Sequence, residues 1–352
     1  MHGIHLLNIE QFFSRRRVMD EQEVKRSAIV PYSILSKNEA TLSYKIKKIP
    51  YYHRFFHVLD DIEEADVEVD SDDMNTTSNI DYYIFKYNDK NAINLTDWIY
   101  SATSIRKLVA GVIDSFQHLL EGLLVLHQNQ IGFFDISPQH ILFLQNAREK
   151  PVWSDFRYSI QLNKLTTEDH TYLLEIVKHI QHFTYMPFEL HVLYYVIQHD
   201  VPFPVIDESF VRDFCDEYIE NMSILRLFSP TFKTNYTKLC IDAMHKYIHQ
   251  DTTFVIKDIV ERKAKWDVYG FSLIYIHIFG CIIKTYALKH TFLNEILHKL
   301  LVNLHPDSTK RLSLDSTKTL FHKYLNESTM DWKFINKIED HSMATLFEEF
   351  SK

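Results

Sequence analysis

The strongest structural signal in the sequence is a run of apolar residues at helical spacing between residues 104 and 128. Side chains that recur at three- and four-residue steps form one continuous apolar stripe on a helix, which must pack against a core. The stripe consists of Ile105, Leu108, Val109, Val112, Ile113, Phe116, Leu119, Leu120 and Leu123. We therefore predict a long buried helix, followed by a loop that carries Asp135 out of the core, a common position for chemistry.

The overall composition is that of a large globular chain without a polyanionic partner. Of its 352 residues, 46% are apolar, which is enough to bury a sizeable core in one large domain or in two lobes. The formal net charge of −9 repels nucleic acid, so we expect no DNA or RNA to bind. The three cysteines are far apart and form neither a disulfide framework nor a four-thiolate metal site. They favour a reducing, intracellular setting.

We expect no membrane segment. The N-terminal residues lack the basic start and the uninterrupted apolar core of a secretion signal. The most apolar run, residues 268–283, is shorter than the roughly 20 residues that span a bilayer, and it contains His277. We interpret this run as a buried core helix.

The first part of the chain, residues 1–88, has a mixed pattern with short β-like runs. The runs are SAIVPYSIL (27–35) and DYYIFKY (81–87). Between them, residues 60–79 carry nine acidic side chains in their first fourteen positions. These charges repel one another and have little to bury, so we predict a solvated loop, with an ion-binding loop as the alternative. From about residue 92 onward, a helical pattern dominates.

A series of short motifs follows the predicted long helix. They are Phe133-Phe134-Asp135 with His140 five positions after the aspartate, Asp155-Phe156-Arg157, Pro187-Phe188-Glu189, Asp267-Val268-Tyr269-Gly270 and Arg311. In order and approximate spacing, the stretch from about residue 81 to 325 resembles a protein kinase, in which H-R-D-x-x-x-x-N is followed by D-F-G and A-P-E. The resemblance is to divergent kinases of the kind found in large DNA viruses.

This resemblance implies an α+β, two-lobed protein-kinase-like fold. A small β-rich N-lobe would comprise residues 1–88, and a large helical C-lobe would comprise residues 89–352. The C-lobe would contain a helical insertion at residues 190–266, where typical kinases have a short linker. The insertion adjoins the face where a peptide substrate would lie, so it either recognises a protein partner or enlarges the core.

The same resemblance assigns catalytic and metal-binding roles to three residues. Asp135 would accept the proton of the substrate hydroxyl and orient it. Asp155 would hold the magnesium or manganese ions that bridge the phosphates of ATP. His140 stands where an asparagine binds the second metal, and imidazole suits manganese or zinc better than magnesium. The implied reaction is phosphoryl transfer from ATP to a serine or threonine hydroxyl of a protein.

Other residues are assigned to the nucleotide pocket. They are Glu39, Phe85, Lys86, Tyr87, Asn88 and Leu142. Glu39 would lie on a helix within residues 36–56 and pair with the lysine that binds phosphate. Val30 stands where that lysine is expected, and Lys25 or Lys37 could replace it from a neighbouring position.

Three scaffold residues are also implied by the resemblance. Glu189 and Arg311 would form a buried ion pair that ties the activation segment to the large lobe. Asp267 would hold the backbone of the loop around Asp135. All three are present in the sequence.

Several nucleotide-handling positions depart from the kinase pattern. None of the six glycines could form the glycine-rich loop that covers the phosphates. Ser137 replaces a lysine that reaches the transferred phosphate, Phe134 replaces an arginine that reads a phosphorylated activation loop, and Arg157 replaces the glycine after Asp-Phe. These changes favour a pseudokinase or a virion-associated scaffold as the alternative to an active kinase. In that alternative, Asp135 caps its loop and Asp155 pairs with Arg157 or a lysine.

Two weaker features complete the sequence-based expectations. His245 and His249 have the i, i+4 spacing of metal ligands on one helix face, but no third ligand is apparent, so a surface or core pair is the simpler interpretation. If the source is a large DNA virus, the protein is expected in the host cytoplasm or in the virion.

Overall fold

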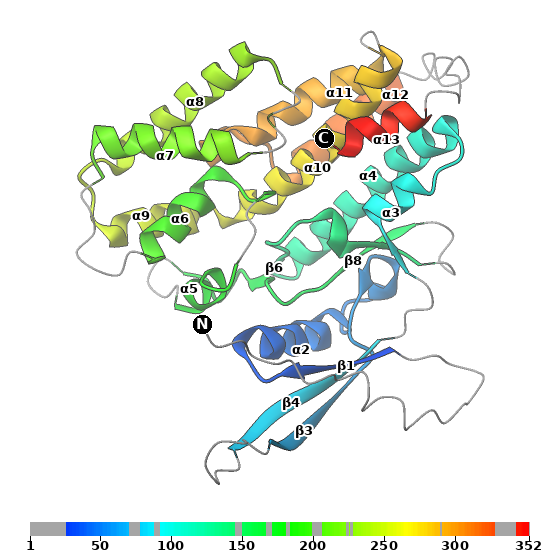
Figure 1. Cartoon of the computed structure of the whole chain (residues 1–352), viewed down its shortest axis with the longest axis vertical. Helices are drawn as coiled ribbons and strands as arrows, with labels where there is room; N and C mark the ends of the chain where they lie inside the picture. The colour runs from blue at the N-terminus through cyan, green and yellow to red at the C-terminus, as the bar shows by residue number, and fades with distance from the viewer. Residues whose placement is uncertain are drawn as a thin grey trace.

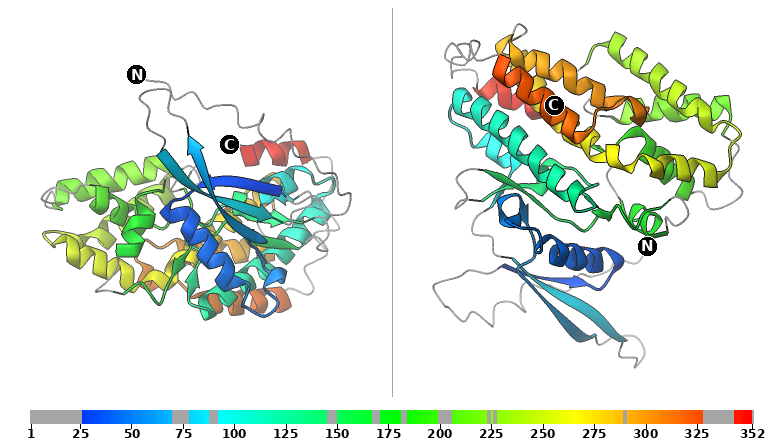
Figure 2. Two further views of the ribbon diagram at one scale, coloured as in Figure 1. Left: turned by 90° about the horizontal axis from the view of Figure 1, so that it is seen from below. Right: turned by 180° about the vertical axis from the view of Figure 1, so that it is seen from behind.

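The computed structural model describes residues 26–69, 78–87, 92–144, 150–166, 171–180, 184–198, 206–222, 225, 228–288, 291–327 and 343–351. A small β-rich part lies at one end of the molecule, and a larger mass of helices lies at the other (Figures 1 and 2). The predicted α+β class is confirmed by this mixture of sheets and helices.

The β-rich end is a three-stranded antiparallel sheet with one helix. Its strands, in spatial order, are β1 (Arg26–Pro31), β4 (Ser78–Tyr87) and β3 (Asp61–Val69). The helix is α2 (Ile34–Ile46), which begins at a capping box between Ser33 and Ser36 and buries Leu42 and Ile46. Between α2 and the sheet, Leu59, Tyr83 and Phe85 form a small separate core.

The acidic segment corrects one sequence-based prediction. Residues 61–69 form strand β3 rather than a solvated loop, while residues 70–77 lie outside the described residues. Lys86 on the neighbouring strand β4 forms ion pairs with both Asp61 and Glu63 and so offsets part of their repulsion. A cross-strand cation of this kind stabilises a pair of strands, and it cannot be read from local composition.

Two predicted boundaries in the β-rich end were also wrong. The β-like run at residues 27–35 stops at Pro31, because Ser33 starts helix α2. The helix expected within residues 36–56 ends at Ile46, and Pro50 follows soon after. Proline disfavours helical backbone in the residue before it, here Ile49, so the helix could not continue to residue 56.

Two small sheets lie between the β-rich end and the helices, and they position the loops of interest (Figure 1). The first contains, in order, β2 (Phe56–His57), β8 (Pro151–Ser154), β7 (Ile141–Phe143) and β5 (Ile93–Asn94). The second pairs β6 (Ile131–Gly132) with β9 (Ile160–Gln161). Because β2 pairs with β8, the sheet crosses the domain boundary predicted at residue 88. The β6–β9 pair brings the loops that carry Asp135 and Asp155 together.

The helical part is built around two long buried helices. Its helices are α3 (Leu95–Tyr100), α4 (Ile105–Gln128), α5 (Thr171–Val177), α6 (Phe188–Gln198), α7 (Glu208–Asn221), α8 (Pro230–Met244), α9 (Thr252–Glu261), α10 (Trp266–Tyr286), α11 (Phe292–Leu300), α12 (Leu314–Glu327) and α13 (Met343–Ser351). The helix predicted from the apolar stripe is confirmed as α4. Its Phe116 packs against Phe271 and Tyr275 of α10 and Phe321 of α12.

Helix α4 and the helical stretch at residues 263–286 are long and apolar enough to cross a membrane, by length and composition alone. In the folded chain, 67% and 89% of their most apolar windows are buried. Both are therefore explained as core helices, as was expected for residues 268–283.

The predicted insertion, residues 190–266, contains most of α6 and all of α7, α8 and α9. In Figure 1, α7 and α8 lie side by side at the edge of the helical part. The predicted placement of His245 and His249 on one helix face was wrong. A 3₁₀ turn starts at His245, and His249 has a left-handed backbone with φ 59°. The two imidazoles therefore do not share the helical repeat that a metal pair needs.

Candidate functional site

The candidate site is a pocket of about 460 Å³ between the β6–β7 loop, the β8–β9 loop and the segment before α6. It is lined by Asp135, Ile136, Ser137, Gln139, His140, Asp155, Arg157, Tyr158, Ile180, Thr184, Tyr185 and Met186. Three of the predicted site residues, Asp135, His140 and Asp155, are thus brought together in one pocket. Among the described residues that line the pocket, all of the charged and imidazole side chains come from the loops of the two small sheets.

His140 lies between the two carboxylates. Its Nδ1 is 2.8 Å from the carbonyl oxygen of Asp135, and a carbonyl only accepts, so Nδ1 carries the hydrogen. In the neutral imidazole, Nε2 then presents its lone pair. This Nε2 is 3.8 Å from Oδ2 of Asp155, while Nδ1 is 3.7 Å from Oδ2 of Asp135. The imidazole therefore turns a possible metal-ligating nitrogen toward Asp155.

Asp155 divides its two carboxylate oxygens between different neighbours. Oδ1 accepts a hydrogen bond from Nε of Arg157 at 2.7 Å, and Oδ2 faces His140. The backbone of Asp155 is left-handed, with φ 62°, a conformation that is uncommon outside glycine but tolerated by aspartate. This turn aims the carboxylate into the pocket.

The backbone of the loop around Asp135 is held by Asp267 of α10. The carboxylate of Asp267 accepts hydrogen bonds from the backbone N–H groups of Phe133 and Phe134, both at 2.7 Å, and contacts Nε2 of His127 at 2.8 Å. Asp267 is only 2% exposed. A buried carboxylate with three donors is well satisfied and fixes the loop backbone.

Buried aromatic rings hold the two aspartate loops against each other. The rings of Phe133 and Phe156 pack edge to face with centroids 5.4 Å apart, and Phe133 also packs on Trp153. Phe156 in turn packs edge to face against Phe56 of β2. This aromatic packing fixes the two aspartate loops relative to each other.

Glu39 lies on α2 behind the pocket, 5% exposed, and its Oε2 has no hydrogen-bond partner. Burial, followed by the charge of Asp155, raises the pKa of this carboxyl from 4.5 to about 8, although the charge of Arg157 and a hydrogen bond from the backbone of Phe156 act in the other direction. Glu39 is therefore largely protonated at neutral pH. Among the described residues, the cation that acts on it is Arg157.

The lysine expected to pair with Glu39 is not found among the described residues. Val30, at the predicted lysine position, packs with the small core of the β-rich end. Lys37 is exposed on α2, and Lys25 lies outside the described residues. Lys37, the substitute that the structure describes, is therefore not buried with Glu39.

Of the other residues predicted for the nucleotide, the four that the structure describes do not line the pocket. Phe85 is buried in the small core, Lys86 pairs with the acidic side chains of β3, and Tyr87 stacks on His57 with ring centroids 6.1 Å apart. Leu142 is half-buried in β7. Asn88 lies outside the described residues. The charge of Tyr87 nevertheless acts on Arg157 of the pocket, so this part of the β-rich end lies near the pocket without lining it.

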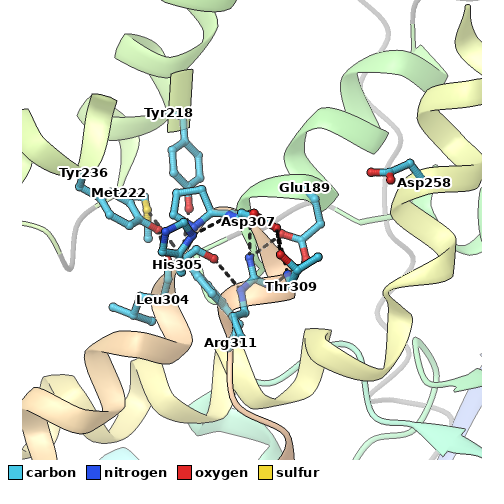
Figure 3. Close-up of polar contacts among 12 residues, drawn as sticks. Glu189, Tyr218, Met222, Tyr236, Asp258, Leu304, His305, Asp307, Thr309 and Arg311 are labelled. Atoms are coloured by element: carbon cyan, nitrogen blue, oxygen red, sulfur yellow. Dashed lines mark hydrogen bonds and ion pairs between the residues drawn. The ribbon is translucent and has the colours of Figure 1, made fainter. Parts of the chain in front are cut away.

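Figure 3 shows the ion pair between Glu189 and Arg311 deep in the helical part. Nη1 and Nη2 of Arg311 donate to the two carboxylate oxygens of Glu189 at 2.7 and 2.6 Å, and Nε donates to the carbonyl of His305 at 2.7 Å. The guanidinium also lies 4.9 Å from the ring centre of Tyr269. This bidentate pair ties the start of α6 to the segment before α12.

Sequence reasoning missed two residues beside the pocket. Asn38 of α2 donates from Nδ2 to the carbonyls of Arg157 and Ser159, both at 2.8 Å, and accepts from the hydroxyl of Tyr172. Tyr158 lines the pocket, and burial followed by the charge of Asp135 raises its pKa. Neither residue belongs to a recognisable motif. Both interact with residues distant in sequence, which the sequence alone does not place nearby.

Among the described residues, no group of three or more histidine, cysteine, aspartate or glutamate side chains could hold a metal by itself. Mg²⁺ and Mn²⁺ bound with a nucleotide need only one or two protein ligands, because the phosphates and water supply the rest. Oδ2 of Asp155 and Nε2 of His140 lie 3.8 Å apart in the pocket.

Comparison with models of known protein families finds no match, and comparison with curated proteins finds none either. The function is therefore inferred from the pocket and from the kinase-like order of motifs.

Proposed function

We propose that this chain is a divergent protein kinase-like protein that binds ATP with Mg²⁺ or Mn²⁺ and transfers a phosphoryl group to a serine or threonine hydroxyl of a protein. The observation that supports it most directly is that Asp135 and Asp155, on different loops, line one pocket with His140 between them. The sheet order β1-β4-β3 beside α2, next to a helical mass, is compatible with a two-lobed kinase-like fold.

In this proposal, each pocket residue has one role. Asp135 accepts the proton of the attacking hydroxyl and orients its oxygen. Asp155 and His140 would hold a metal ion, which would supply positive charge to neutralise the phosphates. Asp267 keeps the Asp135 loop in place through its hydrogen bonds to the loop backbone.

A second candidate function is a non-catalytic binding module, a pseudokinase. It is favoured by the ion pair between Arg157 and Asp155, which occupies one oxygen of the carboxylate that would hold the metal. The absence of a lysine beside Glu39 among the described residues points the same way. Such a module would use helices α7 and α8 of the insertion to bind a protein partner.

A thermal-shift titration with ATP in the presence of Mg²⁺ and then Mn²⁺ distinguishes the two candidates. Ligand at one hundred times its dissociation constant adds about 2.7 kcal/mol of stability. We expect a metal-dependent shift for the wild type that is lost in Asp155→Asn and kept in Asp213→Asn, an exposed site on α7. Transfer of radiolabelled phosphate should be lost in Asp135→Asn while nucleotide binding remains.

The opposite results would select the binding module. If neither metal gives a shift with ATP, nucleotide chemistry is excluded as the function of the pocket. If ATP binds but Asp135→Asn transfers phosphate at the wild-type rate, Asp135 is not the catalytic base.

A further inference from the structure

Arg157 is the only lysine or arginine among the described residues that line the pocket. The other lining residues contribute two carboxylates, one imidazole and neutral side chains. A nucleoside triphosphate carries several negative charges, which a site with two carboxylates would repel unless a cation offsets them. Among the described lining residues, Arg157 is therefore the side chain that can supply the positive charge that a polyphosphate needs, alongside any bound metal ion.

The side chain of Arg157 is positioned for this task. Its Nε donates to Oδ1 of Asp155 at 2.7 Å, and the side chain, which lines the pocket, is 51% exposed. Its backbone carbonyl is fixed by Asn38. A guanidinium held through Nε still has the four N–H groups of its two terminal nitrogens, which match pairs of phosphate oxygens.

The surroundings of Glu39 also indicate a role for Arg157. In the resemblance to kinases, Glu39 is the partner of a phosphate-binding lysine, but Val30 stands at the lysine position and packs with the small core. Arg157 is the cation whose charge reaches both Glu39 and Asp155. Arg157 contacts Asp155 directly, and its charge also acts on Glu39.

We propose that Arg157 binds the phosphate groups of the nucleotide, anchored by its Nε–H on Asp155 and presenting its terminal nitrogens to the phosphate oxygens. This inference rests on the proposed nucleotide site and assigns the polyphosphate part of it. Asp155 then has two functions, since Oδ1 anchors the guanidinium and Oδ2 remains beside Nε2 of His140.

The competing interpretation makes the opposite prediction for the same variant. If Arg157 only blocks Asp155, removing its charge frees the carboxylate, and metal-bound polyphosphate binds more tightly. If Arg157 is a phosphate ligand, removing its charge weakens binding, because one charge-assisted contact is lost.

The test is calorimetric titration of inorganic tripolyphosphate and of ATP, each with Mn²⁺, into the wild type, Arg157→Gln and Arg157→Lys. Arg212→Gln is the matched control, because Arg212 is an exposed arginine on α7. We expect affinity for tripolyphosphate to fall at least tenfold in Arg157→Gln, to fall less in Arg157→Lys, which keeps the charge without the planar fork, and to stay unchanged in Arg212→Gln.

A second measurement needs no variant and so does not depend on the folding of Arg157→Gln. Phenylglyoxal modification of the wild type, mapped by peptide mass, should show Arg157 protected by Mn²⁺ with tripolyphosphate and Arg212 not protected. Unchanged or tighter binding in Arg157→Gln, no binding of tripolyphosphate to the wild type, or no protection of Arg157 each overturns the proposal. If tripolyphosphate binds through Arg157 but ATP binds no more tightly, the proposed kinase function fails and the phosphate site stands.

Discussion

At the scale of single residues, the carboxyl groups of Glu39 and Asp267 are both buried but have opposite environments. Asp267 accepts from two backbone N–H groups and contacts His127, so its burial is matched by hydrogen bonds. Glu39 has one oxygen without a partner, and burial raises its pKa to about 8. The loop around Asp135 is thus held by a satisfied carboxylate, while the helix behind Asp155 carries an unsatisfied one.

Glu39 should make the stability of the protein fall as the pH rises. Its carboxyl titrates near 4.5 in the unfolded chain and near 8 in the folded state. Between these values the folded state binds more protons, so the free energy of unfolding decreases with pH, by at most about 1.4 kcal/mol per pH unit. Urea denaturation at several pH values across this window measures the slope.

The matched variant for this prediction is Glu39→Gln, which keeps the shape and removes the titration. Its stability should depend less steeply on pH than that of the wild type, whereas Glu208→Gln, on the exposed start of α7, should leave the slope unchanged. Equal slopes for the wild type and Glu39→Gln would mean that Glu39 is charged in the folded protein at neutral pH.

At the scale of secondary structure elements, the close approach of α10 to the pocket loops depends on Gly270. A Cβ added there would lie 2.7 Å from the backbone carbonyl of Tyr185 and 3.0 Å from Cβ of Ile136. Both residues line the pocket. The missing side chain therefore lets α10 support two walls of the site at once.

Gly270→Ala should destabilise the protein by about 1–3 kcal/mol, because neither a backbone carbonyl nor a Cβ can move aside without shifting its chain. Gly280→Ala, in the same helix, is the control and should be neutral or stabilising by up to about 1 kcal/mol, since alanine is the better helix former. Chemical denaturation of the two variants checks both values. A neutral effect at both positions would show that the loops carrying Ile136 and Tyr185 can move away from α10 without loss of stability.

Periodicity and motif order were enough to predict some elements but not others. Helix α4 was predictable because its apolar stripe repeats over many turns, and Asp135 and Asp155 stood out within an ordered series of motifs. Strand β3 was not, because the cation that offsets its acidic residues, Lys86, lies on another strand. The pairing of Arg157 with Asp155 was offered only as an alternative, since a side chain's orientation does not follow from its place in a motif.

At the scale of the whole molecule, Asn38 makes several of the polar contacts that join the β-rich end to the helical part. From α2 it donates to two backbone carbonyls of the β8–β9 loop and accepts from Tyr172 of α5. Lys45, about two turns further along α2, donates a hydrogen bond to Gln161 of β9. The position of α2 relative to the pocket thus depends on a small number of side chains.

Asn38→Ala should loosen this junction. It removes the Asn38 donor from the part-buried carbonyl of Arg157 and one of the two donors to the carbonyl of Ser159, at a cost of about 1–3 kcal/mol. Amide hydrogen exchange should rise in residues 157–161 and in α2, while Asn221→Ala, an exposed asparagine at the end of α7, should leave exchange there unchanged. Unaltered exchange in the Asn38 variant would mean that apolar packing alone holds the two parts together.

The pairing of β2 with β8 has an evolutionary consequence. Phe56 belongs by sequence to the β-rich end, yet its ring packs against Phe156 in the β8–β9 loop. A recombination that exchanged the first 88 residues with those of a relative would separate the two rings. Natural variants should therefore change these two positions together, so that covariation between them records how closely the two ends of the molecule have been selected as one unit.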